Sequence, residues 1–364
     1  MPAVPQFAVA KPGWGHYLFA MLPLSVLDLC FVTSATPGSA ALRNSLDLAR
    51  HADRLGYTRY WVAEHHNLPS VASSAPDLMI GQIAAVTTRM RVGSGGVMLP
   101  NHAPLTVAER FTTLEALFPG RIDLGIGRAP GTDPVTSMAL RRRQGVAEDD
   151  DFLDRFQELL LLESHGFPPG HPFATISAMP ADAPLPPIWL LGSSDYSARL
   201  AAQIGAGFAF AHHFASHDAV AAMQDYRQRF EARGSLDKPH AILATAVVCA
   251  DTDEEAEHLA ATVDLNFARR ARGEFKPLAS PEEARAELWS DVDRRRAQAN
   301  RGRVFVGSPA TVRARLAALI EATAADEVMV TSAIFDHEAR KRSYTLLAEA
   351  FGLAAARDAA AVPA

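Results

Sequence analysis

The sequence predicts an α/β fold, a closed (β/α)8 TIM-like barrel, with an insertion after the seventh strand–helix unit. Short apolar runs rich in β-branched residues are each followed by a helical pattern, and this pairing occurs eight times along 364 residues. An open doubly wound sheet would usually have a glycine-rich turn after its first strand, whereas Val32-Thr33-Ser34-Ala35 stands there. Eight units without such a turn favour the barrel.

The eight units follow from the change of hydrophobic period between strand and helix. In the first helix Ser45, Leu48, Ala52 and Leu55 share one face, and Gly56 ends it. The predicted strands cover residues 24–32, 57–63, 91–99, 121–127, 187–191, 207–211, 241–250 and 327–331. The helices that follow them cover residues 39–55, 76–88, 104–118, 148–164, 195–205, 217–233, 253–272 and 336–351.

One region, residues 273–303, does not fit this pattern. It separates the seventh helix from another helix start at Ser308-Pro309, where the serine is an N-cap and the proline takes the first helical position. Its charges, including Arg294-Arg295-Arg296, are typical of a solvated helix face. The alternative is a lid over the barrel mouth. We therefore expect an N-terminal extension at 1–22, a barrel domain at 23–352 that contains this insertion, and a C-terminal tail at 353–364.

Composition excludes several classes of protein. The chain has 35 basic and 41 acidic residues, a net charge of −6, and no long basic run, which argues against nucleic acid or an acidic membrane surface as a partner. Cys30 and Cys249 cannot form a disulfide framework, so we expect an intracellular, cytoplasmic protein. No apolar stretch reaches the roughly 18 residues of a membrane span, and the N-terminus lacks the pattern of a signal peptide.

Unusual residues lie near the carboxyl ends of five predicted strands, where barrel enzymes have their active sites. They are Glu64-His65-His66, Gly93-Ser94-Gly95-Gly96, Gly125-Ile126-Gly127-Arg128, Gly192-Ser193-Ser194 and His212-His213. Each motif alone has an ordinary structural explanation, such as a hydrogen-bonded histidine, a glycine at a bulge or a helix N-cap. Their convergence on one mouth favours a functional site.

The serines and the arginine suit a phosphate group. Ser193 and Ser194 precede a helix, whose first backbone N–H groups can bind an anion. Arg128 can add bidentate hydrogen bonds from the neighbouring strand. Asp195 is compatible with such a site only if its charge points to solvent.

The glycines and histidines suit the rest of a flat ligand. Gly95, Gly96 and Gly127 remove side chains where a planar ring could lie against the backbone. The remaining volume would be lined by groups that donate or accept protons, namely His65, His66, His212 and His213.

Four segments resemble the bacterial luciferase-like flavin monooxygenase family. They are residues 62–66 (VAEHH), 91–100 (RVGSGGVMLP), 119–128 (PGRIDLGIGR) and 190–194 (LLGSS), and the resemblance runs from about residue 24 to 352. It is closest to the single-chain "luciferase family oxidoreductase, group 1" branch. The resemblance implies an FMNH2-dependent monooxygenase that uses O2 on a small organic substrate through a flavin C4a-hydroperoxide. It also implies FMN as the cofactor, with its reduced form acting as a co-substrate, a separate flavin reductase, and a homodimer formed through the second and third helices.

The resemblance assigns roles to particular residues. His65 falls on the family's catalytic, proton-transferring histidine, and Gly95-Gly96 falls on a dipeptide joined by a non-proline cis peptide bond behind the flavin. Phosphate-binding positions of the family fall on Arg128 and Ser193, with Tyr196 close to another. The predicted cofactor-binding set is therefore Gly95, Gly96, Gly127, Arg128, Gly192, Ser193, Ser194 and Tyr196, with His66, His212 and His213 in the substrate pocket.

Several alternatives stay open. Light-emitting subunits have alanines at Gly95-Gly96 and a cysteine at Gly127, so we do not expect this chain to emit light. Relatives of the family use a deazaflavin, which makes a deazaflavin-dependent oxidoreductase one alternative, and a flavin carrier without turnover is another. A metal-dependent hydrolase built on the four histidines is disfavoured, because neighbouring residues of a strand point to opposite faces, and we predict no metal site.

Overall fold

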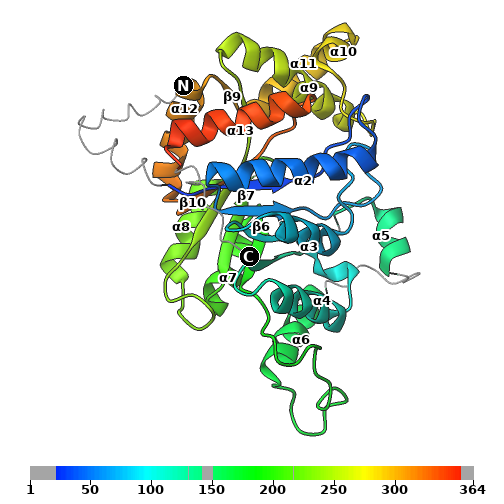
Figure 1. The fold of residues 1–364 in the computed structure, drawn as a ribbon, viewed down its shortest axis with the longest axis vertical. Coiled ribbons are helices and arrows are strands. Elements are labelled where there is room, and N and C mark those ends of the chain that lie inside the picture. The colour runs from blue at the N-terminus through cyan, green and yellow to red at the C-terminus, as the bar shows by residue number, and fades with distance from the viewer. Residues whose placement is uncertain (1–21, 130, 142–150, 216, 354–364) are drawn as a thin grey trace, which may run out of the picture.

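Eight parallel strands close into a barrel, which confirms the predicted fold class (Figure 1). The computed structural model describes residues 22–129, 131–141, 151–215 and 217–353. The strand order is β10-β1-β2-β3-β5-β6-β7-β8, and β8 pairs back to β10. The barrel strands are β1 (Leu24–Asp28), β2 (Arg59–Val62), β3 (Arg91–Ser94), β5 (Ile122–Gly127), β6 (Ile188–Gly192), β7 (Gly207–Ala211), β8 (Ala241–Cys249) and β10 (Glu327–Thr331). A short strand, β4 (Val97–Met98), continues the pairing with β5 beyond the end of β3.

The two faces of the strands build two separate cores. A small cluster includes Leu27, Trp61, Trp189 and Met329, which come from four barrel strands. Trp61 and Trp189 contact each other edge to face, with ring centroids 5.5 Å apart. The alternate residues of the strands join the larger cluster, which includes residues of the surrounding helices. This alternation explains why the strands are apolar on both faces.

Eight helices flank the barrel (Figure 1). They are α2 (Gly38–Leu55), α3 (Pro76–Val86), α4 (Pro104–Leu117), α6 (Phe152–Ser164), α7 (Asp195–Ile204), α8 (Ala219–Arg229), α12 (Pro309–Thr323) and α13 (His337–Phe351). Gly56 ends α2 in the left-handed conformation at φ 88°, as the sequence predicted. A 3-10 turn at Leu99–Asn101 precedes α4, and a helix that the sequence did not predict, α5 (Pro134–Arg141), lies between β5 and α6.

The insertion is larger than the sequence indicated. The predicted seventh helix of the ring, α9 (Asp253–Ala271), packs instead on α10 (Pro281–Ala286), α11 (Asp291–Asn300) and an unpredicted strand, β9 (Val304–Gly307). The place between α8 and α13 is taken by α12. β9 pairs with the last four residues of β8, so this strand continues past the barrel and carries the insertion (Figure 1).

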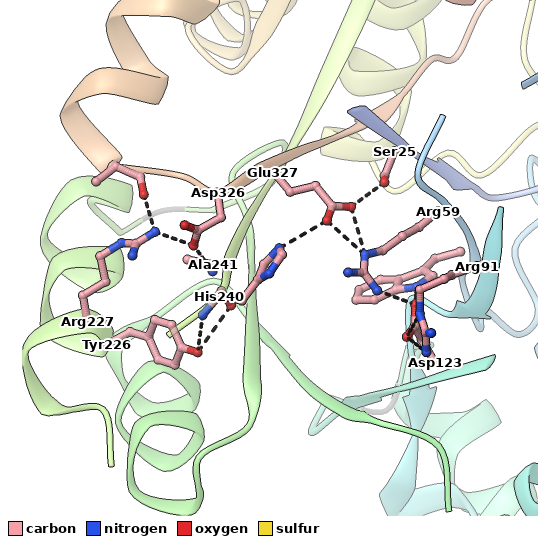
Figure 2. Close-up of polar contacts among 12 residues, drawn as sticks. Ser25, Arg59, Arg91, Asp123, Tyr226, Arg227, His240, Ala241, Asp326 and Glu327 are labelled. Atoms are coloured by element: carbon pink, nitrogen blue, oxygen red, sulfur yellow. Dashed lines mark hydrogen bonds and ion pairs between the residues drawn. The ribbon is translucent and has the colours of Figure 1, made fainter. Parts of the chain in front are cut away.

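The end of the barrel where the strands begin, opposite the mouth, is closed by a network of charged side chains (Figure 2). The Arg59 guanidinium lies between two buried carboxylates, with Nη1 2.8 Å from Asp123 Oδ2 and Nε 3.0 Å from Glu327 Oε2. Arg91 also binds Asp123, and His240 Nε2 lies 3.2 Å from Glu327. Each buried charge therefore has an opposite charge as a partner.

Some predictions lie outside the described residues. These are the N-terminal extension apart from Leu22, the first residues of the helix predicted at 148–164, and the C-terminal tail apart from Leu353. Among the helices that the structure does describe, none has the length and apolar character needed to cross a membrane.

Candidate active site

His65 lies three residues after the end of β2, at the barrel mouth. Its backbone N–H donates to the Ser73 carbonyl (2.9 Å), and its ring Nδ1 lies 3.1 Å from the Gly131 carbonyl oxygen. A carbonyl only accepts, so this contact requires the proton on Nδ1 and leaves the Nε2 lone pair available. The surrounding protein lowers the pKa of the partly exposed ring by desolvation. His65 is therefore arranged to stay neutral and to accept a proton at Nε2.

Glu64 anchors the neighbouring histidine. The buried carboxylate accepts hydrogen bonds from His66 Nε2 (2.9 Å), His102 Nε2 (2.9 Å) and the Met98 backbone N–H (2.9 Å). Burial alone would raise the pKa of Glu64, but the hydrogen bonds from His102, His66 and Met98 hold it below its usual value. The ring of His66, predicted as a pocket residue, is thus bound to a buried acid rather than to His65.

The two histidines that follow β7 have different surroundings. His213 repeats the arrangement of His65, because its Nδ1 lies 3.2 Å from the Ala244 carbonyl oxygen. Desolvation lowers the pKa of His213 to about 4, with smaller contributions from the charges of His212 and His65. His212 instead faces the Phe305 ring at a centroid distance of 6.3 Å. His213 therefore has the same kind of backbone contact as His65, whereas His212 lies beside β9.

The Gly95–Gly96 peptide bond is cis, as the family resemblance implied. A Cβ on Gly95 would lie 2.6 Å from Leu27 Cδ1, and one on Gly96 would lie 2.7 Å from the Gly125 carbonyl oxygen. A Cβ on Gly127 would meet the Met98 sulfur at 2.7 Å. In the direction of a Cβ, protein atoms already fill the space beside these three glycines. The glycines allow β3, β4 and β5 to approach closely.

The predicted phosphate-binding residues do come together. The Arg128 guanidinium carbon lies 4.4 Å from the centroid of the Tyr196 ring, in the first turn of α7. Ser194 is the N-cap of α7, but its side chain makes no capping hydrogen bond. Within the described part of the chain, neither the Ser193 nor the Ser194 hydroxyl makes a hydrogen bond. The start of α7 thus offers hydroxyl and backbone donors beside a guanidinium.

The flanking residues support this arrangement. Asp195 pairs with Arg199 at 2.9 Å, and both side chains are 54% exposed, so the acid points to solvent as required. A Cβ on Gly192 would lie 2.5 Å from the Ser197 hydroxyl oxygen. Glycine at this position therefore lets α7 start directly against β6.

Sequence reasoning missed the roles of three residues around the mouth. Glu64 belongs to the Glu64-His65-His66 motif, but its position in the sequence does not show that its carboxylate binds the rings of His66 and His102. His102 follows the 3-10 turn at Leu99–Asn101 and carries no local signal. Arg270, near the end of α9, interacts electrostatically with His65, although 205 residues separate them in the sequence.

Comparison with known proteins first defines the class of protein. The family model of luciferase-like monooxygenases matches residues 23–327, and the chain belongs to this family. Membership confirms that the protein is an oxidoreductase of the monooxygenase type.

Individual relatives extend over nearly the whole chain. It is 43% identical over 325 residues to a protein from Escherichia coli named luciferase-like monooxygenase, covering 89% of this chain and 96% of that one. It is 34% identical over 336 residues to N-acetyl-S-alkylcysteine monooxygenase from Bacillus subtilis, covering 91% and 98%. The crystal structure of apo-MsnO8 is similar with a TM-score of 0.84 and 38% identity, covering 93% of this chain and all of that one.

More distant structures share the fold and differ in the cofactor. The oxygenating constituent of 3,6-diketocamphane monooxygenase from Pseudomonas putida, in complex with FMN, is 19% identical with a TM-score of 0.66, covering 91% of this chain and 98% of that one. An F420-dependent secondary alcohol dehydrogenase, in complex with an F420–acetone adduct, is 14% identical with a TM-score of 0.64, covering 91% and 99%. Proteins of this fold therefore hold either FMN or F420.

Proposed function

We propose that the protein is an FMNH2-dependent monooxygenase that acts on a small organic substrate and does not emit light. The observation that carries this proposal is the donor set at the start of α7, where Ser193 and Ser194 lie beside the Arg128–Tyr196 pair. Seryl hydroxyls, helix N–H groups and a guanidinium together match the phosphate of FMN. Reduced FMN, when bound, supplies the two electrons with which one oxygen atom of O2 enters the substrate and the other leaves as water.

The residues of the chain have separate tasks in this proposal. Ser193, Ser194 and Arg128 hold the phosphate, and the Tyr196 ring keeps the guanidinium in place. His65, neutral with its Nδ1 proton donated to the Gly131 carbonyl, accepts a proton at Nε2. The mouth around them excludes water from the reacting groups.

The first test is an anaerobic titration of the purified protein with FMN and with reduced FMN, followed by admission of O2. Tighter binding of the reduced form and substrate-dependent O2 consumption support the proposal. Binding of F420 with no binding of either FMN form would instead favour a deazaflavin-dependent oxidoreductase, which the same phosphate site could serve.

Replacing His65 separates proton transfer from flavin binding. His65→Ala should lower turnover by about 10²- to 10⁴-fold, the usual contribution of a general base, while FMN affinity stays nearly unchanged. His65→Asn is the matched control, because its amide can still donate to the Gly131 carbonyl but cannot accept the proton. Steady-state kinetics and flavin titration of both variants check this, and an equal loss of binding and turnover would contradict the assigned role.

Replacing Arg128 tests the phosphate site. Arg128→Ala should weaken FMN binding by about 1–3 kcal/mol, the usual contribution of a charge-assisted hydrogen bond. Riboflavin lacks the phosphate, so its affinity should be unchanged in the same variant. Arg199→Ala removes another arginine, exposed and paired with Asp195 of the same helix, and serves as the control. Unchanged FMN affinity in Arg128→Ala would contradict the phosphate assignment.

The substrate and the protein partners belong to the same proposal. N-acetyl-S-alkylcysteines are the first compounds to test, because a relative is named for them. A separate flavin reductase supplies the reduced flavin. A homodimer through α3 and α4 is supported by Leu78 and Leu117, which are 71% and 66% exposed on these helices. Light scattering of the purified protein, whose chain is 39.1 kDa, checks the dimer.

A further inference from the structure

The insertion contains a cavity of about 910 Å³, bounded by α9, α10, α11, β9 and α12. Small-molecule sites have volumes of roughly 300–1,000 Å³, so this cavity is large enough for a ligand. Three of the helices around it, α9, α10 and α11, lie together at the top of Figure 1. The described residues that line it include none of those assigned to the barrel mouth or to the start of α7. The cavity is therefore separate from the candidate active site.

Positive charge is concentrated in this cavity. Four arginines and two acids line it, which gives the described lining a net charge of +2, whereas the whole chain has a net charge of −6. Both acids bind the same arginine, since Arg301 Nη2 lies 2.9 Å from Glu257 and 2.7 Å from Asp264. The positive charge of the lining therefore comes from the other three arginines.

These three arginines are Arg285 of α10, Arg294 of α11 and Arg315 of α12. Arg285 makes no hydrogen bond or ion pair with any residue that the structure describes. Arg294 donates to the Trp289 carbonyl (3.2 Å) and lies 4.0 Å from Asp291. Arg315 donates to a backbone carbonyl (3.4 Å). Within the described chain, no acid lies closer than 4.0 Å to any of the three guanidinium groups.

Trp289 adds an aromatic side chain to the lining. Its half-buried indole packs beside a small apolar cluster of Leu265, Ala279 and Ala284, and Nε1 donates to the Ala284 carbonyl (2.9 Å). The same residue holds the Arg294 guanidinium through its backbone carbonyl. The cavity therefore combines cationic groups with a fixed aromatic ring.

The structure also separates the members of the Arg294-Arg295-Arg296 run, a sequence typical of a solvated helix face. Arg294 lines the cavity, and Arg296 donates to the Ala271 carbonyl (3.3 Å). Arg295 is exposed and is not among the described lining residues. The run is therefore more than a solvated face, because one of its members belongs to the cavity.

We propose that this cavity binds a phosphorylated small molecule with a flat ring, of the size and chemistry of a single nucleotide. Guanidinium groups bind phosphate oxygens with paired hydrogen bonds, and three of them suit a ligand with two or more negative charges. Planar bases stack on aromatic side chains. The net charge of −6 disfavours a longer nucleic acid strand. This site goes beyond the proposed monooxygenase function and does not depend on it.

The test is a calorimetric titration of the full-length protein without flavin, at low ionic strength because salt screens exposed charges. The probes are ADP, which has phosphates and a base, pyrophosphate, which has phosphates alone, and adenosine, which has the base alone. Arg285→Gln and Arg315→Gln are compared with Arg295→Gln, an equal change in charge outside the described lining. Arg285→Lys keeps the charge and loses the paired hydrogen bonds.

We expect ADP to bind more tightly than pyrophosphate, and adenosine to bind least. Arg285→Gln and Arg315→Gln should each weaken ADP binding about tenfold, the effect of losing a charge-assisted hydrogen bond. Arg285→Lys should fall between, and Arg295→Gln should behave as the wild-type protein.

Tryptophan fluorescence locates the bound probe. ADP should change the emission of Trp289, whereas Trp61 and Trp189 are buried within the barrel. Trp289→Phe keeps an aromatic ring, so it should still bind ADP in the calorimeter while the fluorescence change is lost. A fluorescence change that persists in Trp289→Phe would place ADP elsewhere and overturn the proposal.

Four further results would overturn it. They are no binding of ADP, binding of pyrophosphate or adenosine as tight as that of ADP, unchanged ADP affinity in either Arg285→Gln or Arg315→Gln, and tighter binding of an oligoglutamate peptide, which would indicate a protein partner. Arg128→Ala shows whether ADP instead occupies the start of α7. If this variant loses ADP binding and Arg285→Gln keeps it, the proposal is wrong. Since FMN is titrated separately, failure of this site is distinguishable from failure of the proposed function.

Discussion

At the scale of single residues, two histidines of the barrel mouth share the same backbone contact. His65 and His213 each place Nδ1 against a backbone carbonyl, at 3.1 Å and 3.2 Å, and desolvation lowers both pKa values. The backbone contact selects the tautomer, and desolvation keeps the ring neutral. The two rings are therefore proton acceptors of defined orientation.

The lowered pKa of His213 predicts that the stability of the protein depends on pH. Its folded pKa of about 4 lies below the ordinary 6.5, so its contribution is fully present above pH 6.5 and is lost as the pH falls to about 4. The shift corresponds to about 3 kcal/mol at most, and solvent at the partly exposed ring reduces this to about 2 kcal/mol. Between these pH values, His213→Asn should therefore lose about 2 kcal/mol less stability than the wild-type protein in urea unfolding. Parallel curves for the two proteins would contradict the neutral state of His213.

At the scale of elements, close approach of neighbouring strands shapes the floor of the mouth. Ser94, the last residue of β3, donates its hydroxyl to the Gly125 carbonyl (2.8 Å) and accepts from the Gly125 N–H (3.0 Å). The next residues, Gly95 and Gly96, lead into β4, which resumes pairing with β5 at Val97. The glycines at these positions are therefore a requirement of the strand contact.

Gly125→Ala tests this contact. A Cβ there would lie 2.0 Å from the Ser94 backbone oxygen, which cannot move without shifting β3. We expect a loss of about 3 kcal/mol or more in the free energy of unfolding, at the upper end of overpacking costs. Gly302→Ala is the control, because its Cβ would meet only the Ala299 oxygen at an ordinary 3.6 Å. Equal stability of the two variants in thermal or urea unfolding would show that the strands tolerate a side chain.

At the scale of the whole molecule, the two ends of the barrel have different tasks. The end where strands begin buries Arg59 between Asp123 and Glu327, and Figure 2 shows the network continuing through His240. Burial alone would raise the pKa of Glu327, but Arg59 keeps it below its usual value. The opposite end carries the partly exposed histidines His65, His66, His212 and His213. The end where the strands begin therefore stabilises the fold, and the opposite end carries the candidate active site, as in other barrels of this kind.

Arg59→Met tests this division. The variant leaves two buried carboxylates without their shared cation, and we expect it to lose about 3–5 kcal/mol of stability. Arg91→Met is milder, because Asp123 keeps its contact with Arg59. Flavin affinity of the folded Arg59→Met protein should equal that of the wild-type protein. A loss of affinity without a loss of stability would show that the network acts on the mouth.

The sequence by itself determined the barrel and much of the predicted phosphate site. The alternation of hydrophobic periods is a local property, and it predicted the eight barrel strands. The motifs at strand ends predicted that Arg128 lies near Ser193 and Ser194, because strand ends of one barrel necessarily meet at one mouth, and the family resemblance added Tyr196. The charge of Asp195 required that it point to solvent beside a phosphate, and the structure meets this condition.

Only the tertiary structure decided which groups act on those residues. Periodicity predicted α9 as a helix but could not show that α12 replaces it in the ring, since both helices have an apolar face. Nor could it show that Glu64 binds the rings of His66 and His102. These contacts depend on how the insertion and the loops pack, and a hydrogen bond or a charge at a distance leaves no pattern in the sequence around either partner.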